Sequence, residues 1–369
     1  MFRPGIDTLE KDQELDYSSD AYVMYHALTP EWPALSIDIV PDRLGPERTK
    51  VCRLFIKWVG LSLMALYHFT FLFLFFLQFP LTAYFVAGTQ ADRPSKNSLQ
   101  VLKVSELHKT KHDDDDSESS DDDSDVDEDP ILENQRIPHE GGINRVRVMP
   151  QNPHMVATWS DRGIINLYDI RPQLATLDID MSNGGFASDQ APVAPATSRK
   201  EPIYSFKGHA DEGFAMDWSK VSPGRLVTGD CKKFIYVWDA VAGQPITTVG
   251  GVPPHCVATD KSTTATWKVS KVPYSGHADS VEDLQWSPTE STVFASCGVD
   301  QTVRIWDTRD ASKSQISVHA ADYDINVIAW NEKIPYLLAS GSDDGSFKIW
   351  DLRNFKRTCS DSTSGYSGF

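Results

Sequence analysis

Histidine, serine or threonine, aspartate and tryptophan recur at fixed spacing in the second half of the chain. Counting back from Trp238, Trp306 and Trp350, the tenth residue is Thr228, Ser296 and Ser340. The sixth residue back is Lys232, Asp300 and Asp344, and the segments open with His209, His277 and His319. A histidine, a hydroxyl and a carboxylate could form the catalytic trio of a hydrolase. They could also form a buried structural network, because buried polar groups must hydrogen-bond one another.

The recurrence argues against catalysis. A single active site needs the trio once, whereas here it returns in every repeat. The chain contains no GxSxG elbow, P-loop, HExxH or GxGxxG motif, and the His139-Glu140-Gly141-Gly142 stretch lacks the second histidine of a zinc motif. We therefore expect no enzyme, no cofactor and no metal ion, and interpret the recurring residues as structural.

These residues lie in internal repeats that predict short strands. Three segments align from Gly208, Gly276 and His319, and a more divergent fourth begins at Ile143. Runs of strand length such as FAMDW and FIYVW alternate with Gly, Pro, Asp and Ser turns. The GH…WD pattern is typical of WD40 blades, each a four-stranded antiparallel sheet. The prediction is an all-β WD40 β-propeller.

In WD40 proteins the recurring positions resemble a His–Ser/Thr–Asp–Trp tetrad that ties the strands of a blade together. Lys232 and Arg162 stand where two of the blades should carry the aspartate. Those two blades should therefore be held more weakly or differently.

Acidic residues are concentrated in one run. The formal net charge of −17 makes direct nucleic-acid binding unexpected, because phosphates attract basic surfaces. Without the twelve carboxylates between Asp113 and Asp129 the charge would be −5. We expect a disordered loop that binds Lys- and Arg-rich proteins in a salt-sensitive manner, with a solvated spacer as the alternative. The candidate client-binding residues are Asp113, Asp114, Asp115, Asp116, Glu118, Asp121, Asp122, Asp123, Asp125, Asp127, Glu128 and Asp129.

The segment MYHALTPEWPALSIDIVPD, from Met24 to Asp42, resembles the N-terminal histone-binding segment of the WD40 histone chaperones. Its candidate binding residues are Glu31, Trp32 and Pro33. The order of LTAYFVAGTQA, the acidic run, GGINRVRV, SFKGHADEGFAMDWS and DDGSFKIWDLRNFK is similar to that of the glutamate-rich WD-repeat family. The resemblance implies a nuclear and nucleolar chaperone of basic clients, namely histones and a large-subunit ribosomal protein during ribosome assembly.

Two WDxR boxes favour an alternative role. Trp306-Asp307-Thr308-Arg309 and Trp350-Asp351-Leu352-Arg353 resemble the box of substrate receptors for cullin-based ubiquitin ligases, in which the arginine faces the adaptor. The candidate adaptor contacts are Asp307, Arg309, Asp351 and Arg353. A local Asp–Arg pair at a blade edge is the bland interpretation.

Residues 58–79, WVGLSLMALYHFTFLFLFFLQF, contain no Asp, Glu, Lys or Arg. A stretch of about 20 apolar residues can span a bilayer, which would make the chain a membrane-anchored WD40 scaffold. In the resembling family the flanking segments join almost directly, so retained or mispredicted sequence is the other interpretation.

About five blades are expected, where the resembling family closes a ring with seven, and open edges would remain. The expected organisation is a histone-binding-like segment at 1–50, the apolar insert at 51–79, a first blade at 80–108, the acidic loop at 109–136, WD40 repeats at 137–357 and a divergent tail at 358–369.

Overall fold

Antiparallel strands make up most of the computed structural model. It describes residues 24–41, 80–108, 130–178, 201–240 and 267–354. Within these ranges the strands form five sheets, each of which is one propeller blade. The predicted all-β WD40 propeller is confirmed, and so is the expectation of about five blades among the described residues.

The blades follow one another in sequence order, and the first strand of each lies innermost. Blade 1 contains β1 (Ala34–Ile39), β2 (Leu81–Thr89), β3 (Ser98–Leu107) and β4 (Ile131–Pro138). Blade 2 contains β5 (Ile143–Val148), β6 (Met155–Ser160), β7 (Ile165–Asp169) and β8 (Tyr204–Phe206). Blade 3 contains β9 (Ala215–Trp218), β10 (Leu226–Gly229), β11 (Ile235–Ala240) and β12 (Trp267–Val269). Blade 4 contains β13 (Val281–Trp286), β14 (Val293–Gly298), β15 (Thr302–Asp307) and β16 (Ile316–His319). Blade 5 contains β17 (Ile325–Trp330), β18 (Leu337–Ser342) and β19 (Phe347–Asp351).

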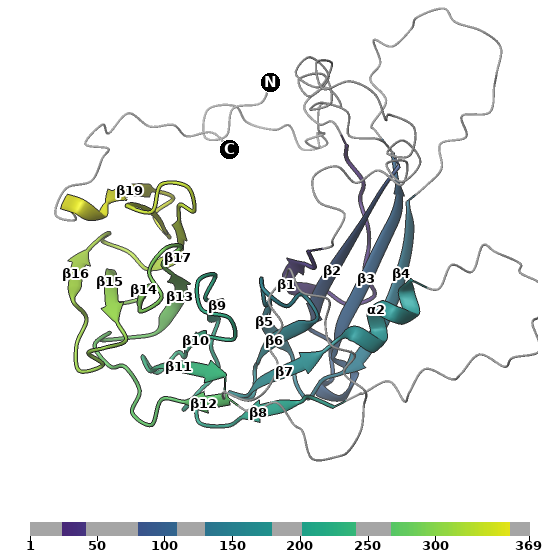
Figure 1. The fold of residues 1–369 in the computed structure, drawn as a ribbon, viewed down its shortest axis with the longest axis horizontal. Helices are drawn as coiled ribbons and strands as arrows, with labels where there is room; N and C mark the ends of the chain where they lie inside the picture. Colours follow the sequence, from purple (N-terminus) through teal and green to yellow (C-terminus); the bar gives the residue numbers. More distant parts are fainter. Residues whose placement is uncertain (1–23, 42–79, 109–129, 179–200, 241–266, 355–369) are drawn as a thin grey trace, which may run out of the picture.

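The five blades form an arc, with blade 1 at one end and blade 5 at the other (Figure 1). The helix α2 (Arg171–Leu177) follows β7 and covers the joint between blades 1 and 2, where Lys103 Nζ donates to the Leu177 carbonyl at 2.7 Å. Two 3-10 turns, η2 (Pro94–Lys96) and η3 (Leu352–Asn354), complete the regular structure of the described ranges.

Blade 1 corrects two of the predicted boundaries. Its inner strand β1 comes from the segment assigned to histone binding, and it pairs with β2 across the apolar insert. Its outer strand β4 comes from residues assigned to the acidic loop, because Ile131–Pro138 pairs along the whole of β3. The blade thus takes strands from both sides of the two inserted segments, whose residues 42–79 and 109–129 lie outside the described ranges.

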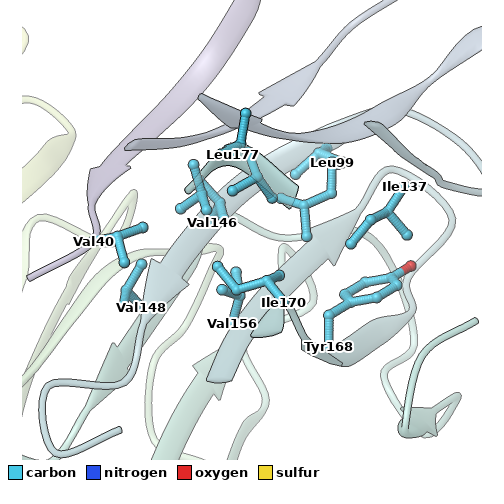
Figure 2. Close-up of a cluster of buried hydrophobic side chains, with 12 residues drawn as sticks. Val40, Leu99, Ile137, Val146, Val148, Val156, Tyr168, Ile170 and Leu177 are labelled. Carbon is cyan, nitrogen blue, oxygen red and sulfur yellow. The ribbon is translucent and has the colours of Figure 1, made fainter. Parts of the chain in front are cut away.

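Each blade packs one row of three cross-strand neighbours against the blade before it, and we name this the leading row. The leading rows of blades 2 to 5 are Val148–Val156–Tyr168, Trp218–Leu226–Trp238, Trp286–Phe294–Trp306 and Trp330–Leu338–Trp350. All twelve side chains are buried. Figure 2 shows the joint of blades 1 and 2, where Val148, Val156 and Tyr168 meet Leu99 and Ile137. Burial of these apolar side chains is the main force that joins the blades.

Hydrogen bonds from inner-strand side chains also cross the joints. The Val148 amide donates to Asp38 Oδ2 at 2.8 Å, between blades 1 and 2. The Trp286 amide donates to Asp217 Oδ2 at 2.7 Å, between blades 3 and 4. The Ile328 amide donates to Asp283 Oδ2 at 3.1 Å, between blades 4 and 5. These bonds satisfy amides on the channel edge of each inner strand, which has no strand partner there.

Among the described residues, no helix is long and apolar enough to cross a membrane. The apolar insert at residues 58–79 lies outside the described ranges.

Candidate functional site

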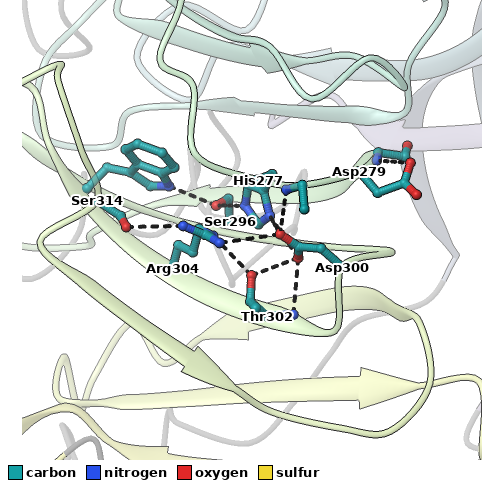
Figure 3. Close-up of polar contacts among 10 residues, drawn as sticks. His277, Asp279, Ser296, Asp300, Thr302, Arg304 and Ser314 are labelled. Atoms are coloured by element: carbon teal, nitrogen blue, oxygen red, sulfur yellow. Dashed lines mark hydrogen bonds and ion pairs between the residues drawn. The ribbon is translucent and has the colours of Figure 1, made fainter.

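The tetrad of blade 4 forms one continuous hydrogen-bonded chain (Figure 3). His277 Nδ1 lies 2.9 Å from Asp300 Oδ2, and His277 Nε2 lies 2.6 Å from Ser296 Oγ. Trp306 Nε1 donates to the same Ser296 Oγ at 2.8 Å. With the proton on Nδ1, the imidazole donates to Asp300 and accepts from Ser296, which leaves every polar atom of the chain partnered.

Burial fixes the protonation state of this network. The His277 side chain has no exposed surface. Burial lowers the pKa of His277 below 6.5, although its hydrogen bond to Asp300 acts in the opposite direction. Burial also disfavours the charge on Asp300, but hydrogen bonds from His277, Thr302 and the Ala278 amide together lower the pKa of this carboxyl. A neutral histidine sealed beneath the blade surface ties strands together and cannot meet a substrate.

Blade 3 forms the same network with a different aspartate. His209 contacts Asp230 Oδ2 at 2.9 Å and Thr228 Oγ1 at 2.8 Å, and Trp238 Nε1 donates to Thr228 at 3.0 Å. The prediction that Lys232 weakens this blade is wrong, because Asp230, two residues earlier, supplies the carboxylate. The Lys232 side chain is exposed and lies 3.5 Å from Asp211.

Blade 2 uses a carbonyl in place of the carboxylate. His139 Nε2 lies 3.0 Å from Thr158 Oγ1, and its Nδ1 lies 3.0 Å from the Gly141 carbonyl oxygen. Arg162 is exposed and takes no part, so this blade is held differently, as predicted. The sequence reasoning missed His139 as a network residue. Its position 19 residues before Thr158, the separation of His209 from Thr228, would have revealed it.

In blade 5 only half of the predicted tetrad is present. Trp350 Nε1 donates to Ser340 Oγ at 2.9 Å. His319 is exposed and contacts Asp322 at 3.4 Å, and Asp344 is an exposed acceptor for the Ser346 amide. The assignments of His319 and Asp344 to a tetrad are therefore wrong. The position 19 residues before Ser340 is Ala321, which has no polar side chain.

The loops at one edge of the blades carry a surplus of carboxylates that the sequence reasoning did not assign. This edge holds the histidine-bearing loops and the hairpins between second and third strands, which are joined by bonds such as Asp343 N to Asp324 O at 3.0 Å and Cys231 N to Glu212 O at 2.9 Å. The carboxylates outside the tetrads, named here the acidic rim, are Glu140, Asp161, Asp211, Glu212, Asp279, Glu282, Asp322, Asp324, Asp343 and Asp344. They outnumber the basic residues of the same loops, which are Arg162, Lys207, Lys232 and Lys233.

The arginines of the WDxR boxes lie at the opposite edge. Arg309 Nε donates to both Asp307 carboxylate oxygens at 3.0 Å, and Arg353 Nε donates to Asp351 Oδ1 at 2.9 Å. The hydrogen bonds from Arg309 lower the pKa of Asp307 to about 2. The Arg309 and Arg353 side chains remain 76% and 64% exposed, so each box presents a held but accessible guanidinium.

The predicted histone-binding residues contact the outer part of blade 1. Glu31 Oε2 accepts from Arg136 NH1 at 2.6 Å, and the Trp32 ring lies 5.0 Å from Lys96 Nζ. The Pro33 carbonyl accepts from the Gln90 amide at 2.8 Å. These contacts fasten the segment to the blade. The twelve carboxylates from Asp113 to Asp129 lie outside the described residues.

A cavity of about 420 Å³ lies where the inner strands of blades 1 to 3 end. Its walls carry Asp38, Arg147, Asp217 and Lys220 beside apolar residues. Burial raises the pKa of Asp217 to about 7, against the opposing effects of the Trp286 amide, Lys220 and Arg147, while Asp283 adds to the rise.

Comparison with known proteins follows the same order as the fold. Residues 267–307 and 312–351 match the family model of the WD domain, G-beta repeat. With its five sheets, this makes the chain a WD40 β-propeller protein. Residues 12–108 match the family of the histone-binding protein RBBP4 and its counterpart in the CAF1 complex.

The chain is, more narrowly, a relative of the glutamate-rich WD-repeat proteins, as the sequence motifs predicted. It is 40% identical over 320 residues to the glutamate-rich WD repeat-containing protein 1 of Dictyostelium discoideum, covering 84% of this chain and 53% of the relative. It is 36% identical to the protein HEAT STRESS TOLERANT DWD 1 of Arabidopsis thaliana, covering 84% and 58%. It is 35% identical to the ribosome assembly protein rrb1 of Schizosaccharomyces pombe, covering 87% and 55%. The chain thus spans little more than half the length of these relatives.

The two histidines assigned to tetrads, one correctly and one wrongly, make a matched pair. His277→Ala should lower the free energy of unfolding by about 2 to 4 kcal/mol, because Ser296 and Asp300 lose their buried partner. His319→Ala should change it by no more than about 0.5 kcal/mol, since that ring is exposed. Urea unfolding of both variants measures the difference, and equal losses would contradict the assignment.

Asp217 should make stability decrease as pH rises. Its pKa of about 7 in the folded state lies above the ordinary value of 3.8, so folding favours the protonated carboxyl. This contribution is complete below pH 3.8 and is lost as the pH rises through 7. Asp217→Asn should therefore gain stability relative to the native chain between pH 4 and 7, with a constant difference at higher pH. Urea unfolding at several pH values tests this, and a pH-independent difference would refute it.

Proposed function

We propose that this chain is a non-enzymatic chaperone of basic proteins, acting on histones and on a ribosomal protein in the nucleus and nucleolus. The proposal rests chiefly on one coincidence: a match to a histone-binding family in a chain whose propeller loops and inserted run are both acidic. The relative named as a ribosome assembly protein supports the second client class.

Charge gives the proposed mechanism. The acidic rim lies at one edge of the blades, and the run from Asp113 to Asp129 joins β3 to β4 at the other edge. A basic client could thus be neutralised at two separate surfaces before nucleic acid competes for it. Such binding is long-range, fast and weakened by salt, because it depends on many exposed charges.

The acidic run and the rim can be tested separately against purified histones. Replacing the twelve acids of residues 113–129 by Asn and Gln should weaken binding at least about tenfold at physiological salt and flatten its salt dependence. Asp322→Asn with Asp324→Asn and Asp343→Asn should weaken it less, since three charges are removed instead of twelve. Titration calorimetry over a salt series measures both effects.

The control variant is Asp310→Asn, an exposed carboxylate on neither surface, which should leave affinity unchanged. Unchanged affinity after neutralising both acidic surfaces would refute the charge mechanism.

A second candidate function is supported by the WDxR geometry. We propose that Arg309 and Arg353, each held by its own aspartate but mostly exposed, bind the adaptor of a cullin-based ubiquitin ligase. A guanidinium orientated by one carboxylate loses less freedom when it binds a second partner. This role and chaperoning are compatible.

Capture of purified adaptor by the intact chain tests this second function. Arg309→Ala and Arg353→Ala should each reduce capture at least about tenfold, as expected for a binding hot spot. Arg93→Ala, an exposed arginine on the loop between β2 and β3, should have no effect. Capture that survives both box substitutions would exclude the proposed contact.

A further inference from the structure

The blades at the two ends of the arc each leave one apolar face exposed. In blade 1 the leading row is Ile39–Phe85–Leu102, at the register positions that carry the buried rows of the other blades. Ile39 is 56% exposed, and Leu35 and Ile37 on the same side of β1 are 61% and 59% exposed. Nothing among the described residues covers this leading face.

At the other end, blade 5 exposes the side that points away from blade 4. Val327, Gly341 and Phe347 are cross-strand neighbours there, and so are Ala329, Ala339 and Ile349. Val327 is 52%, Phe347 65% and Ile349 38% exposed. We name this surface the trailing face of blade 5.

Blade 4 shows what a trailing face is built to contact. The positions 44 residues before Gly341, Phe347 and Ile349 are Cys297, Val303 and Ile305. All three are buried, and they pack against the leading row of blade 5. A trailing face and a leading face are therefore the two halves of one recurring joint, and the described chain presents one unused copy of each half.

The polar groups at the two open halves are also matched. In blade 4 the residues that bond across the joint are Asp283 and Gln285, which accept from the Ile328 and Trp330 amides. Blade 5 has Val327 and Ala329 at these positions, so its trailing face brings no acceptor. On β1 the Ile39 amide already donates to Asp38 Oδ1 at 3.0 Å. Joining the faces would thus bury apolar surface without leaving that amide unpaired.

We propose that the two faces bind each other between copies of this chain, the trailing face of one copy on the leading face of the next. The halves cannot meet within one copy, because blades 1 and 5 lie at opposite ends of the arc (Figure 1). The contact is heterologous, so association is not limited to dimers and increases with concentration. Neither set of exposed apolar residues includes a charged side chain that would oppose it.

Complementary variants test this arrangement. Phe347→Glu should block the trailing face, and Ile37→Glu should block the leading face. Both residues are exposed, so each variant should fold, which circular dichroism and thermal unfolding can verify. Each variant alone should be monomeric at concentrations where the native chain assembles, with association weakened at least about tenfold. An equimolar mixture should form a dimer and nothing larger, because one intact joint remains. Sedimentation velocity reads all three samples.

Val272→Glu, a 69% exposed site on neither face, is the matched control and should assemble like the native chain. Assembly that persists in the Ile37→Glu variant but not in the Phe347→Glu variant would indicate a symmetric contact of two trailing faces and would overturn the proposal. A native chain that stays monomeric, association that survives both substitutions, or a mixture without dimers would overturn it as well.

Discussion

A blade of this propeller cannot bury both of its faces by itself. Each four-stranded sheet has apolar side chains on two sides, and only a neighbouring blade removes them from water. The leading rows, from Val148–Val156–Tyr168 to Trp330–Leu338–Trp350, are the units of that contact. The direction of the arc, the position of every loop and the exposure of the end faces all follow from this packing.

The polar networks depend on the same packing. Trp238 and Trp306 are leading-row residues whose indole nitrogens also donate to the tetrad hydroxyls of Thr228 and Ser296. One side chain thus couples the joint between blades to the network within a blade. Because the histidines are buried and kept neutral, the networks position the outer loops and leave binding to those loops. The acidic rim and the WDxR arginines are accordingly carried on opposite edges of a rigid sheet stack.

Repeat spacing predicted the fold class, most of the strands and the tryptophan–hydroxyl pairs, because these depend on local alternation and fixed hairpin length. It failed where a role can be supplied from more than one position. Asp230 and the Gly141 carbonyl replace the expected aspartate, and Ala321 occupies the place of the histidine that was assigned to His319. The strands of blade 1 were misplaced because their partners are separated by long insertions. The acidic rim escaped notice because its members are scattered in sequence and are brought together only by the hairpin ends.

The central claim is that a blade is stabilised by neighbours on both faces and by its tetrad. Amide hydrogen exchange in dilute solution tests this most directly by comparing β13–β15 of blade 4 with β17–β19 of blade 5. Blade 4 is covered on both sides and has a complete tetrad, whereas blade 5 has one covered face and half a tetrad. The account predicts clearly faster exchange in blade 5. Equal protection of the two blades would contradict it.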